Sequence, residues 1–144
     1  MLKIFISQPM HGLTVQEIEE ERKGVINDIK RYLKEDQYYI FDNHNRDLDF
    51  DISKTMKTPR VYMLGGSISI MGNADVVIFI GDWRNSNGCI IEEYICDLYK
   101  IPTIKSSFAL NRWLFKQKRK LLKQEKEKCK KKEDCILGCI DSSI

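Results

Sequence analysis

The sequence lacks any apolar stretch of the roughly 18 residues that a membrane-spanning helix needs. It also lacks the charged and then apolar layout of a secretory signal, because a strand-like run, Leu2 to Ile6, begins at once. We therefore expect a cytoplasmic protein with no membrane partner. A chain of 144 residues is long enough to bury one core, and its composition is that of an ordinary globular domain.

Metal-binding and dinucleotide-binding motifs are missing too. The five cysteines are an odd number, and no two of them form a CxxC pair. Three of them, Cys129, Cys135 and Cys139, lie on a lysine-rich tail. This pattern favours free thiols in a reducing compartment over zinc binding or disulfides. The acids around His44 have neither His-x-x-His spacing nor the order of a calcium loop. No GxGxxG follows the first apolar run. We expect no metal and no cofactor.

The net charge of +3 conceals an asymmetry along the chain. Acids outnumber bases from Met1 to Asn111, whereas bases dominate from Arg112 onward. A basic tail of this kind binds nucleic acid in some proteins. No aromatic residue is interleaved with the bases after Phe115, so a solvated or oligomer-packing helix is the preferred interpretation, and nucleic acid is not an expected partner.

Strand-like and helix-like segments alternate along the chain. A first strand, Leu2–Ile6, is followed by a loop and by Thr14 and Glu17, which form a capping-box pattern at the start of a helix running to about Lys34. The remaining expected elements are a strand at 37–41, a long polar loop at 42–58, a helix begun by Pro59 and running from 60 to 71, a strand at 76–80, a helix from Cys89 to about Tyr99, a short strand at 102–104, and a terminal helix from 108 to about 132 with a frayed end. This alternation predicts a three-layer α/β domain, residues 1–107, with a mainly parallel sheet, and a basic helix and tail, residues 108–144.

The segment from Ala74 to Glu93 is the expected functional centre. An apolar strand, a polar break from Gly81 to Gly88 and a helix follow one another there. In open α/β sheets, ligands bind at the carboxyl ends of the strands. Glu92, in the first turns of that helix, is therefore the best candidate for chemistry, although it is also a candidate for a plain solvated residue beside Glu93.

Four segments together resemble one known family. They are KIFISQPMHG, LGGSI, ADVVIFIGDW and GCIIEEYICDLYKIP, which span Leu2 to Ile104. In order and spacing they are similar to the nucleoside 2-deoxyribosyltransferase-like superfamily, and closest to its small bacterial and phage DUF4406 group. The resemblance implies a Rossmann-like (flavodoxin-like) core with about five strands. It also implies cleavage of the N-glycosidic bond of a nucleoside or nucleotide, and a homodimer or larger homo-oligomer in which the helix from Phe108 to Leu122 is a candidate contact.

The resemblance also implies roles for individual residues. The family's nucleophilic glutamate falls on Glu92. Two aspartates of the transferases correspond to Ser67 and Ser86, which puts base exchange in doubt and favours hydrolysis of a nucleoside 5′-monophosphate. Asp82 is then the nearest acid in the loop, with two roles left open: a turn former, or an acid or base acting on the nucleobase.

Further residues are candidates for substrate binding. Trp83 either fills the core or stacks on the base, and Gly12 and Gly88 either meet a backbone requirement or allow close approach of a ligand. The loop from Ser7 to Gly12 leads to the N-terminus of the first expected helix, where a bound anion is favoured. The full expected set is Ser7, Gln8, Pro9, Met10, His11, Gly12, Ser67, Trp83, Ser86 and Gly88. A non-catalytic nucleotide-binding or nucleotide-sequestering protein is the alternative function.

Overall fold

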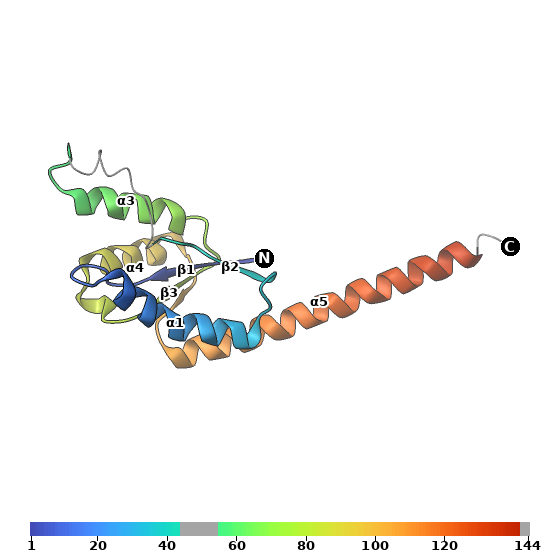
Figure 1. The fold of residues 1–144 in the computed structure, drawn as a ribbon. Coiled ribbons are helices and arrows are strands. Elements are labelled where there is room, and N and C mark those ends of the chain that lie inside the picture. Colours follow the sequence, from blue (N-terminus) through green and yellow to red (C-terminus); the bar gives the residue numbers. More distant parts are fainter. Residues whose placement is uncertain (44–54, 142–144) are drawn as a thin grey trace.

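In the computed structural model, which describes residues 1–43 and 55–141, a parallel four-stranded sheet lies between two layers of helices (Figure 1). The sheet has the order β2-β1-β3-β4. Its strands are β1 Leu2–Ser7, β2 Tyr38–Ile40, β3 Val76–Phe79 and β4 Thr103–Ile104. The four strands expected from the sequence pattern are confirmed. The count of about five, which came from the family resemblance, is wrong for the part of the chain described.

Four helices and one short 3-10 turn complete the described fold. They are α1 Val15–Tyr32, α3 Pro59–Met71, η1 Trp83–Asn85, α4 Asn87–Tyr99 and α5 Ser107–Asp141. Figure 1 shows α1 and the first part of α5 on one face of the sheet, with α3 and α4 on the other. The predicted three-layer α/β architecture is therefore confirmed. Most of the predicted polar loop at 42–58 lies outside the described residues.

Alternating side chains on the central strands form two separate cores. Ile4 and Ile6 point to the α1 and α5 side, where they pack with Ile29 and Leu114. Phe5 points to the other side and packs with residues of α3 and α4. A strand buried on both faces needs an uninterrupted apolar run, and this is why the runs in β1 and β3 do not alternate with polar residues.

Local signals in the sequence account for where two helices begin. Thr14 Oγ1 accepts a hydrogen bond from the Glu17 backbone N–H, and the Glu17 carboxylate accepts one from the Thr14 backbone N–H. This is the predicted capping box, which satisfies two backbone donors that a helix end leaves free. Pro59 occupies the first turn of α3, also as predicted, because its missing N–H has no intrahelical partner there.

Helix α5 is longer than the sequence pattern indicated. The predicted end near Lys132 with a frayed terminus is wrong, because the helix continues to Asp141. At 1.5 Å per residue its 35 residues span roughly 50 Å. Its first turns pack against the sheet, and its second half extends away from the α/β domain (Figure 1).

The strand order positions the site. The chain moves from β1 outward to β2, and then returns to place β3 on the other side of β1. In parallel α/β sheets, such a reversal leaves a crevice outside the carboxyl ends of the two central strands. Here those ends are Ser7 of β1 and Phe79 of β3, which lie in register.

Candidate active site

Glu92 of α4 lies buried beside the carboxyl end of β1, with only 6% of its surface exposed. Its Oε2 accepts a hydrogen bond of 2.5 Å from the Ser7 hydroxyl, and its Oε1 accepts one of 2.9 Å from the Ser67 hydroxyl. Each carboxylate oxygen is therefore held by a different element, β1 on one side and α3 on the other. The three predicted residues Ser7, Ser67 and Glu92 come together although they are distant in sequence.

Two opposing effects act on the pKa of Glu92. Burial disfavours the charged carboxylate and raises the pKa above its ordinary value, while the hydrogen bonds from Ser7 and Ser67 lower it. Burial is the larger effect, so the net pKa is raised. A carboxylate of this kind is held in one orientation and is more basic than an exposed glutamate. Both properties suit a nucleophile or a general base.

Cys89, which the sequence interpretation did not select, lies next to this carboxylate. It is buried one helical turn before Glu92 on α4. Burial raises the pKa of its thiol; hydrogen bonding with Ser7 and Ser86 opposes the rise, and the charge of Glu92 adds to it. The thiol is therefore held in its neutral form. The three-residue spacing from Glu92 was the signal available in the sequence, because residues three apart share a helix face.

Gln8 turns away from Glu92 and joins a buried polar network under α1. Its Nε2 donates to the Ile18 carbonyl at 3.0 Å and to Glu21 Oε2 at 2.7 Å. Its Oε1 accepts a hydrogen bond of 3.2 Å from Arg22 Nη1. These three bonds favour a structural role for Gln8, and its predicted role in substrate binding stays a prediction.

Arg22 is the centre of that network. Its Nη2 donates to Asn43 Oδ1 at 2.8 Å, and Asn43 Nδ2 in turn donates to the Ile6 carbonyl at 3.2 Å. Burial lowers the pKa of Arg22 to about 10, and the charge of Asp42 opposes this decrease. The network holds the backbone on both sides of Ser7, because Ile6 and Gln8 are its two neighbours. Nothing in the sequence pattern indicated that Arg22 is buried.

The rest of the loop after β1 is half-buried or exposed. Pro9 and Met10 are half-buried, and Gly12 has a φ of +79°, a value that favours glycine and explains its presence in this turn. The exposed His11 accepts a hydrogen bond of 2.8 Å at Nε2 from Arg60, because a guanidinium only donates. Arg60 was not among the predicted site residues. It lies seven residues before Ser67, and this spacing gives the two residues the same face of α3.

The expectation of an anion site at the N-terminus of α1 is not supported. The Glu17 carboxylate already accepts the hydrogen bond of the Thr14 backbone N–H there. A negative group of the protein thus occupies the position where a bound anion would be favoured.

The polar loop before α4 is held by its own side chains. Both carboxylate oxygens of the exposed Asp82 accept from Asn85 Nδ2, at 3.0 and 2.8 Å, which favours the turn-former alternative for Asp82. Ser86 is the N-cap of α4 and accepts from the Cys89 backbone N–H at 3.5 Å. A Cβ added at Gly88 would meet ordinary contacts such as Leu64 Cδ1 at 3.8 Å, so the packing does not require glycine at this position.

Trp83 belongs to the core. Its indole packs against Phe79 with ring centroids 5.0 Å apart, and only 5% of the residue is exposed. The guanidinium of Arg84 lies 4.4 Å from the centre of the indole ring. This burial favours the core-filling alternative over stacking on a nucleobase, because the ring faces are already occupied.

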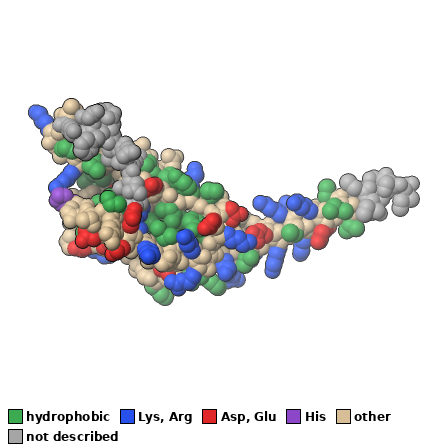
Figure 2. Space-filling model, in the orientation of Figure 1, with side chains coloured by type: hydrophobic (Ala, Val, Ile, Leu, Met, Phe, Trp, Pro, Cys, Tyr) green, Lys and Arg blue, Asp and Glu red, His purple; other side chains and the backbone are tan. Residues whose placement is uncertain are grey.

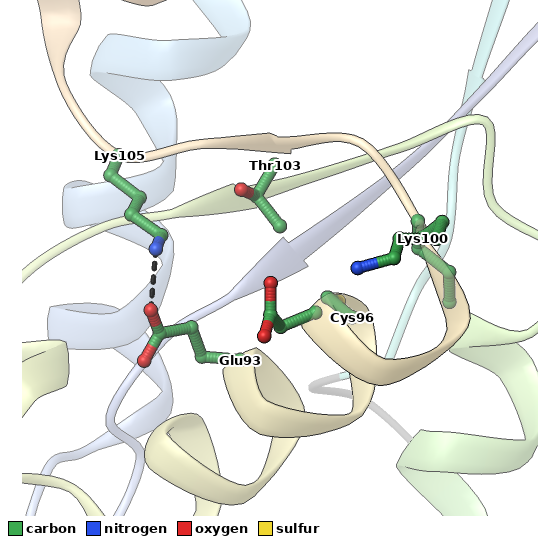
Figure 3. Close-up of a pocket in the computed structure, with 7 residues that line it drawn as sticks. Glu93, Cys96, Lys100, Thr103 and Lys105 are labelled. Carbon is green, nitrogen blue, oxygen red and sulfur yellow. Dashed lines mark hydrogen bonds and ion pairs between the residues drawn. The ribbon is translucent and has the colours of Figure 1, made fainter.

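A separate hollow of about 240 Å³ lies on the other side of α4, beside β4 (Figure 3). Glu93 faces it and forms an ion pair with Lys105, and Cys96, Lys100 and Thr103 lie around it. The two adjacent glutamates therefore have different surroundings: Glu93 is paired with Lys105 beside this hollow, while Glu92 is buried and bonded to Ser7 and Ser67. The side chains of opposite charge around this hollow do not define one ligand.

Comparisons of the chain with family models, with curated proteins and with solved structures found no match. Within residues 1–43 and 55–141, no helix is both long and apolar enough to cross a membrane. The same residues contain no cluster of three or more His, Cys, Asp or Glu side chains suited to a metal ion. His44 lies outside the described residues. The geometry around Glu92 is thus the basis for a functional proposal.

Proposed function

We propose that the chain is an N-glycosidase that cleaves the base–sugar bond of a nucleoside 5′-monophosphate or a related nucleotide, with Glu92 as the nucleophile. The observation that carries this proposal is the buried Glu92 carboxylate, held at both oxygens by Ser7 and Ser67 beside the carboxyl end of a central strand, the region where ligands bind in this architecture. A carboxylate that is desolvated yet oriented costs little reorganisation when positive charge develops near it.

The chemistry needs a carboxylate of this kind. Breaking the bond between the anomeric carbon and the base nitrogen leaves positive charge on the sugar, as in glycoside hydrolysis. Glu92 forms a bond to that carbon as the base leaves with the bonding electron pair and takes up a proton from solvent. Water then attacks the same carbon, gives up a proton to solvent and releases the Glu92 carboxylate, so that one difficult step is divided into two easier ones.

Residues at the rim support the choice of a phosphorylated substrate. Arg60 and Ser67 lie on one face of α3, about 10 Å apart along the helix at 1.5 Å per residue. The guanidinium of Arg60, with the His11 imidazole beside it, is exposed and suited to a phosphate group. The hydroxyls of Ser7 and Ser67 are engaged by Glu92, so the phosphate role expected for them passes in this proposal to Arg60 and His11.

Water is the proposed acceptor of the sugar. In the resembling transferases, aspartates stand at the positions of Ser67 and Ser86, and here the first serine binds Glu92 while the second caps α4. Neither position therefore carries a carboxylate that could bind a second, incoming base.

A nucleotide-binding protein without turnover is the second candidate. The bonding of Asp82 to Asn85 favours it, because the acid expected to assist the leaving base is engaged in its own turn. General acid assistance contributes about 10²–10⁴-fold to such reactions. Without it, a nucleotide held in the crevice would be bound rather than cleaved.

Chromatography of free base released from a panel of nucleosides and 5′-monophosphates tests the proposal. The wild type is compared with Glu92→Gln and with the matched control Glu93→Gln, which changes the neighbouring glutamate outside the crevice. Base release by the wild type and by Glu93→Gln, but not by Glu92→Gln, is the expected result. Saturable binding of one nucleotide without release by any of the three proteins would instead establish the binding protein.

A further inference from the structure

The second half of α5 projects from the α/β domain as a single exposed helix. Every described side chain from Leu122 to Leu137 is exposed, and the segment extends away from the other elements (Figure 1). Figure 2 shows lysine and arginine side chains along it. The stretch from Arg112 to Lys132 holds eleven bases and two acids, whereas residues 1–111 are net acidic. Like charges this close repel one another along a helix, and a bound polyanion would relieve the repulsion.

The bases of α5 are not spread evenly around it. Six of them recur at alternating spacings of four and three residues: Arg112, Lys116, Arg119, Lys123, Lys126 and Lys130. At 100° per residue, these spacings keep all six within about 40° of one line along the helix, which we call the basic stripe. All six side chains are exposed. The stripe runs for about 27 Å, because its ends lie 18 positions apart and each residue adds 1.5 Å.

The basic stripe faces directly away from the domain. Leu110, Leu114 and Leu121 form the face of α5 that packs on the sheet layer, and at 100° per residue that face lies on the opposite side of the helix from the stripe. Within residues 1–43 and 55–141, no side chain of the stripe takes part in an ion pair. Glu125, one of the two acids nearby, lies toward the domain, 4.0 Å from Lys34 of α1. The stripe therefore presents uncompensated positive charge to a partner.

The composition of the stripe argues against a protein or a membrane as that partner. Lysine is depleted at protein–protein interfaces, whereas four of the six stripe residues are lysines. A helix that lies on a membrane needs a broad apolar face to insert. In α5 the face opposite the stripe is packed on the domain as far as Leu121, and from Lys123 to Asp134 the only apolar residue is Cys129.

A regular line of cations fits the phosphates of a nucleic-acid duplex. Lysine and arginine clustered along one helix are the electrostatic footprint of nucleic-acid binding. The lack of interleaved aromatic residues after Phe115, which made nucleic acid an unexpected partner, argues against stacking on single-stranded bases and not against contact with phosphates. The major groove of B-form DNA admits an α-helix, whereas that of duplex RNA is narrow and deep. A projecting helix therefore fits duplex DNA best.

We propose that the basic stripe of α5 binds the phosphate backbone of double-stranded DNA. Contacts of lysine and arginine with phosphates carry no sequence information, so the binding is independent of base sequence. The proposal does not rest on the proposed glycosidase activity, because the stripe lies on α5 and the Glu92 site is formed by β1, α3 and α4. The α/β domain stays uncovered when DNA is bound, since the stripe points away from it.

Fluorescence anisotropy of a labelled DNA duplex, titrated with the full chain in reducing buffer at several salt concentrations, tests the proposal. A duplex of about 20 base pairs is longer than the stripe at 3.4 Å per pair. Six phosphate contacts predict that the logarithm of the binding constant falls against the logarithm of the salt concentration with a slope of about −5. No saturable binding at low salt, or a slope shallower than about −3, overturns the proposal.

Two triple variants of equal net charge locate the contact. The stripe variant combines Arg119→Gln, Lys123→Gln and Lys126→Gln. The control combines Lys118→Gln, Lys128→Gln and Lys132→Gln, which lie on the opposite side of α5. Glutamine is as good a helix former as lysine or arginine, so both variants are expected to keep the wild-type circular dichroism.

The two variants are expected to bind DNA differently. The stripe variant is expected to bind at least about tenfold more weakly at the same salt concentration, with a slope reduced by about 3, because each phosphate contact contributes about 1 to the slope. The control is expected to keep the wild-type slope. Equal losses in the two variants would show that net charge rather than the stripe binds DNA, and would overturn the proposal.

Competition by other polyanions tests the choice of partner. Unlabelled duplex DNA is expected to displace the labelled duplex at a lower concentration of charge than duplex RNA, single-stranded DNA, polyglutamate or vesicles that contain an anionic lipid. If any of these four competes more strongly than duplex DNA, the partner belongs to that class and the proposal is overturned.

Discussion

The Ser7 hydroxyl lies 2.5 Å from Glu92 Oε2 and joins the carboxyl end of β1 to α4, two positions 85 residues apart in sequence. Because Ser7 ends a strand buried on both faces, the position of its hydroxyl is set by the sheet. Glu92 is thereby oriented by a central strand of the sheet, as a pre-organised reactive group requires.

The first prediction concerns the ionisation of Glu92. Ser7→Ala and Ser67→Ala each remove a hydrogen bond that favours the carboxylate, so each is expected to raise the already raised pKa of Glu92 further. The pKa is measured by carbon-13 NMR titration of labelled glutamate, with Glu92→Gln to assign the signal. Ser69→Ala, on the exposed face of the same helix, is the control and is expected to leave the titration unchanged. Equal titrations in all four proteins would contradict the hydrogen-bonded geometry.

The second prediction concerns stability and pH. Since the folded-state pKa of Glu92 is raised above 4.5, its contribution to stability is most favourable below that pH. The contribution falls as pH rises through the raised pKa, because the unfolded chain then releases its proton first. Glu92→Gln removes this penalty while keeping partners for Ser7 and Ser67. The melting temperature of Glu92→Gln relative to the wild type is therefore expected to rise from about pH 4.5 upward and then level off.

Glu93→Gln, measured alongside, is the control for replacing a glutamate of α4 outside the buried site. If Glu92→Gln were less stable than the wild type at neutral pH, the carboxylate would be favourable to folding, contrary to its burial. In the activity assay, the rate of any base release is expected to be roughly a thousandfold or more lower in Glu92→Gln than in the wild type, because this variant lacks the nucleophile.

The third prediction concerns the buried Arg22 network. Arg22→Met leaves Asn43 Oδ1 and Gln8 Oε1 without their donor, at a cost of about 1–3 kcal/mol for each unsatisfied group. We expect a loss of about 2–5 kcal/mol in the free energy of unfolding, measured with urea. Arg31→Met is the control, because the Arg31 side chain is 69% exposed in its ion pair with Asp28, and the change is expected to cost less than about 1 kcal/mol. Similar losses in both variants would show that Arg22 is not held as described.

The fourth prediction separates the phosphate from the rest of the substrate. Arg60→Ala is expected to raise KM for a 5′-monophosphate about tenfold or more while leaving KM for the matching nucleoside unchanged, since a charge-assisted contact is worth about 1.5–3 kcal/mol. Arg84→Ala is the control, because Arg84 lies on Trp83. An equal effect of Arg60→Ala on both substrates would place the phosphate elsewhere.

Much of the fold was predictable because short-range rules were enough. The apolar runs of β1 and β3 indicate strands buried on both faces, and Thr14 with Glu17 defines the start of α1. The alternation of strands and helices then predicts a parallel sheet. The expectation of about five strands was wrong for the described residues, because it came from the resemblance rather than from any segment of this chain.

The site was predictable only in part. Glu92 follows from a strand, a loop and a helix in order, and that order is visible in the sequence. The engagement of Gln8 by Arg22, of Asp82 by Asn85, and of the α1 N-terminus by its own Glu17 was not visible. Each of these depends on where a flexible polar side chain finds its nearest partner, which short-range patterns do not encode.

The sequence by itself determined the elements, their order and the position of an acidic pair, Glu92 and Glu93, at the start of a helix beyond a central strand. Only the tertiary structure decided which of the two is buried. Neighbouring residues differ by 100° around a helix, so the packing of α4 against β1 and α3 turns Glu92 toward Ser7 and Ser67 and leaves Glu93 to Lys105 at the rim. The orientation of α4 about its own axis depends on how three elements pack together, so it cannot be read from the sequence of any one of them.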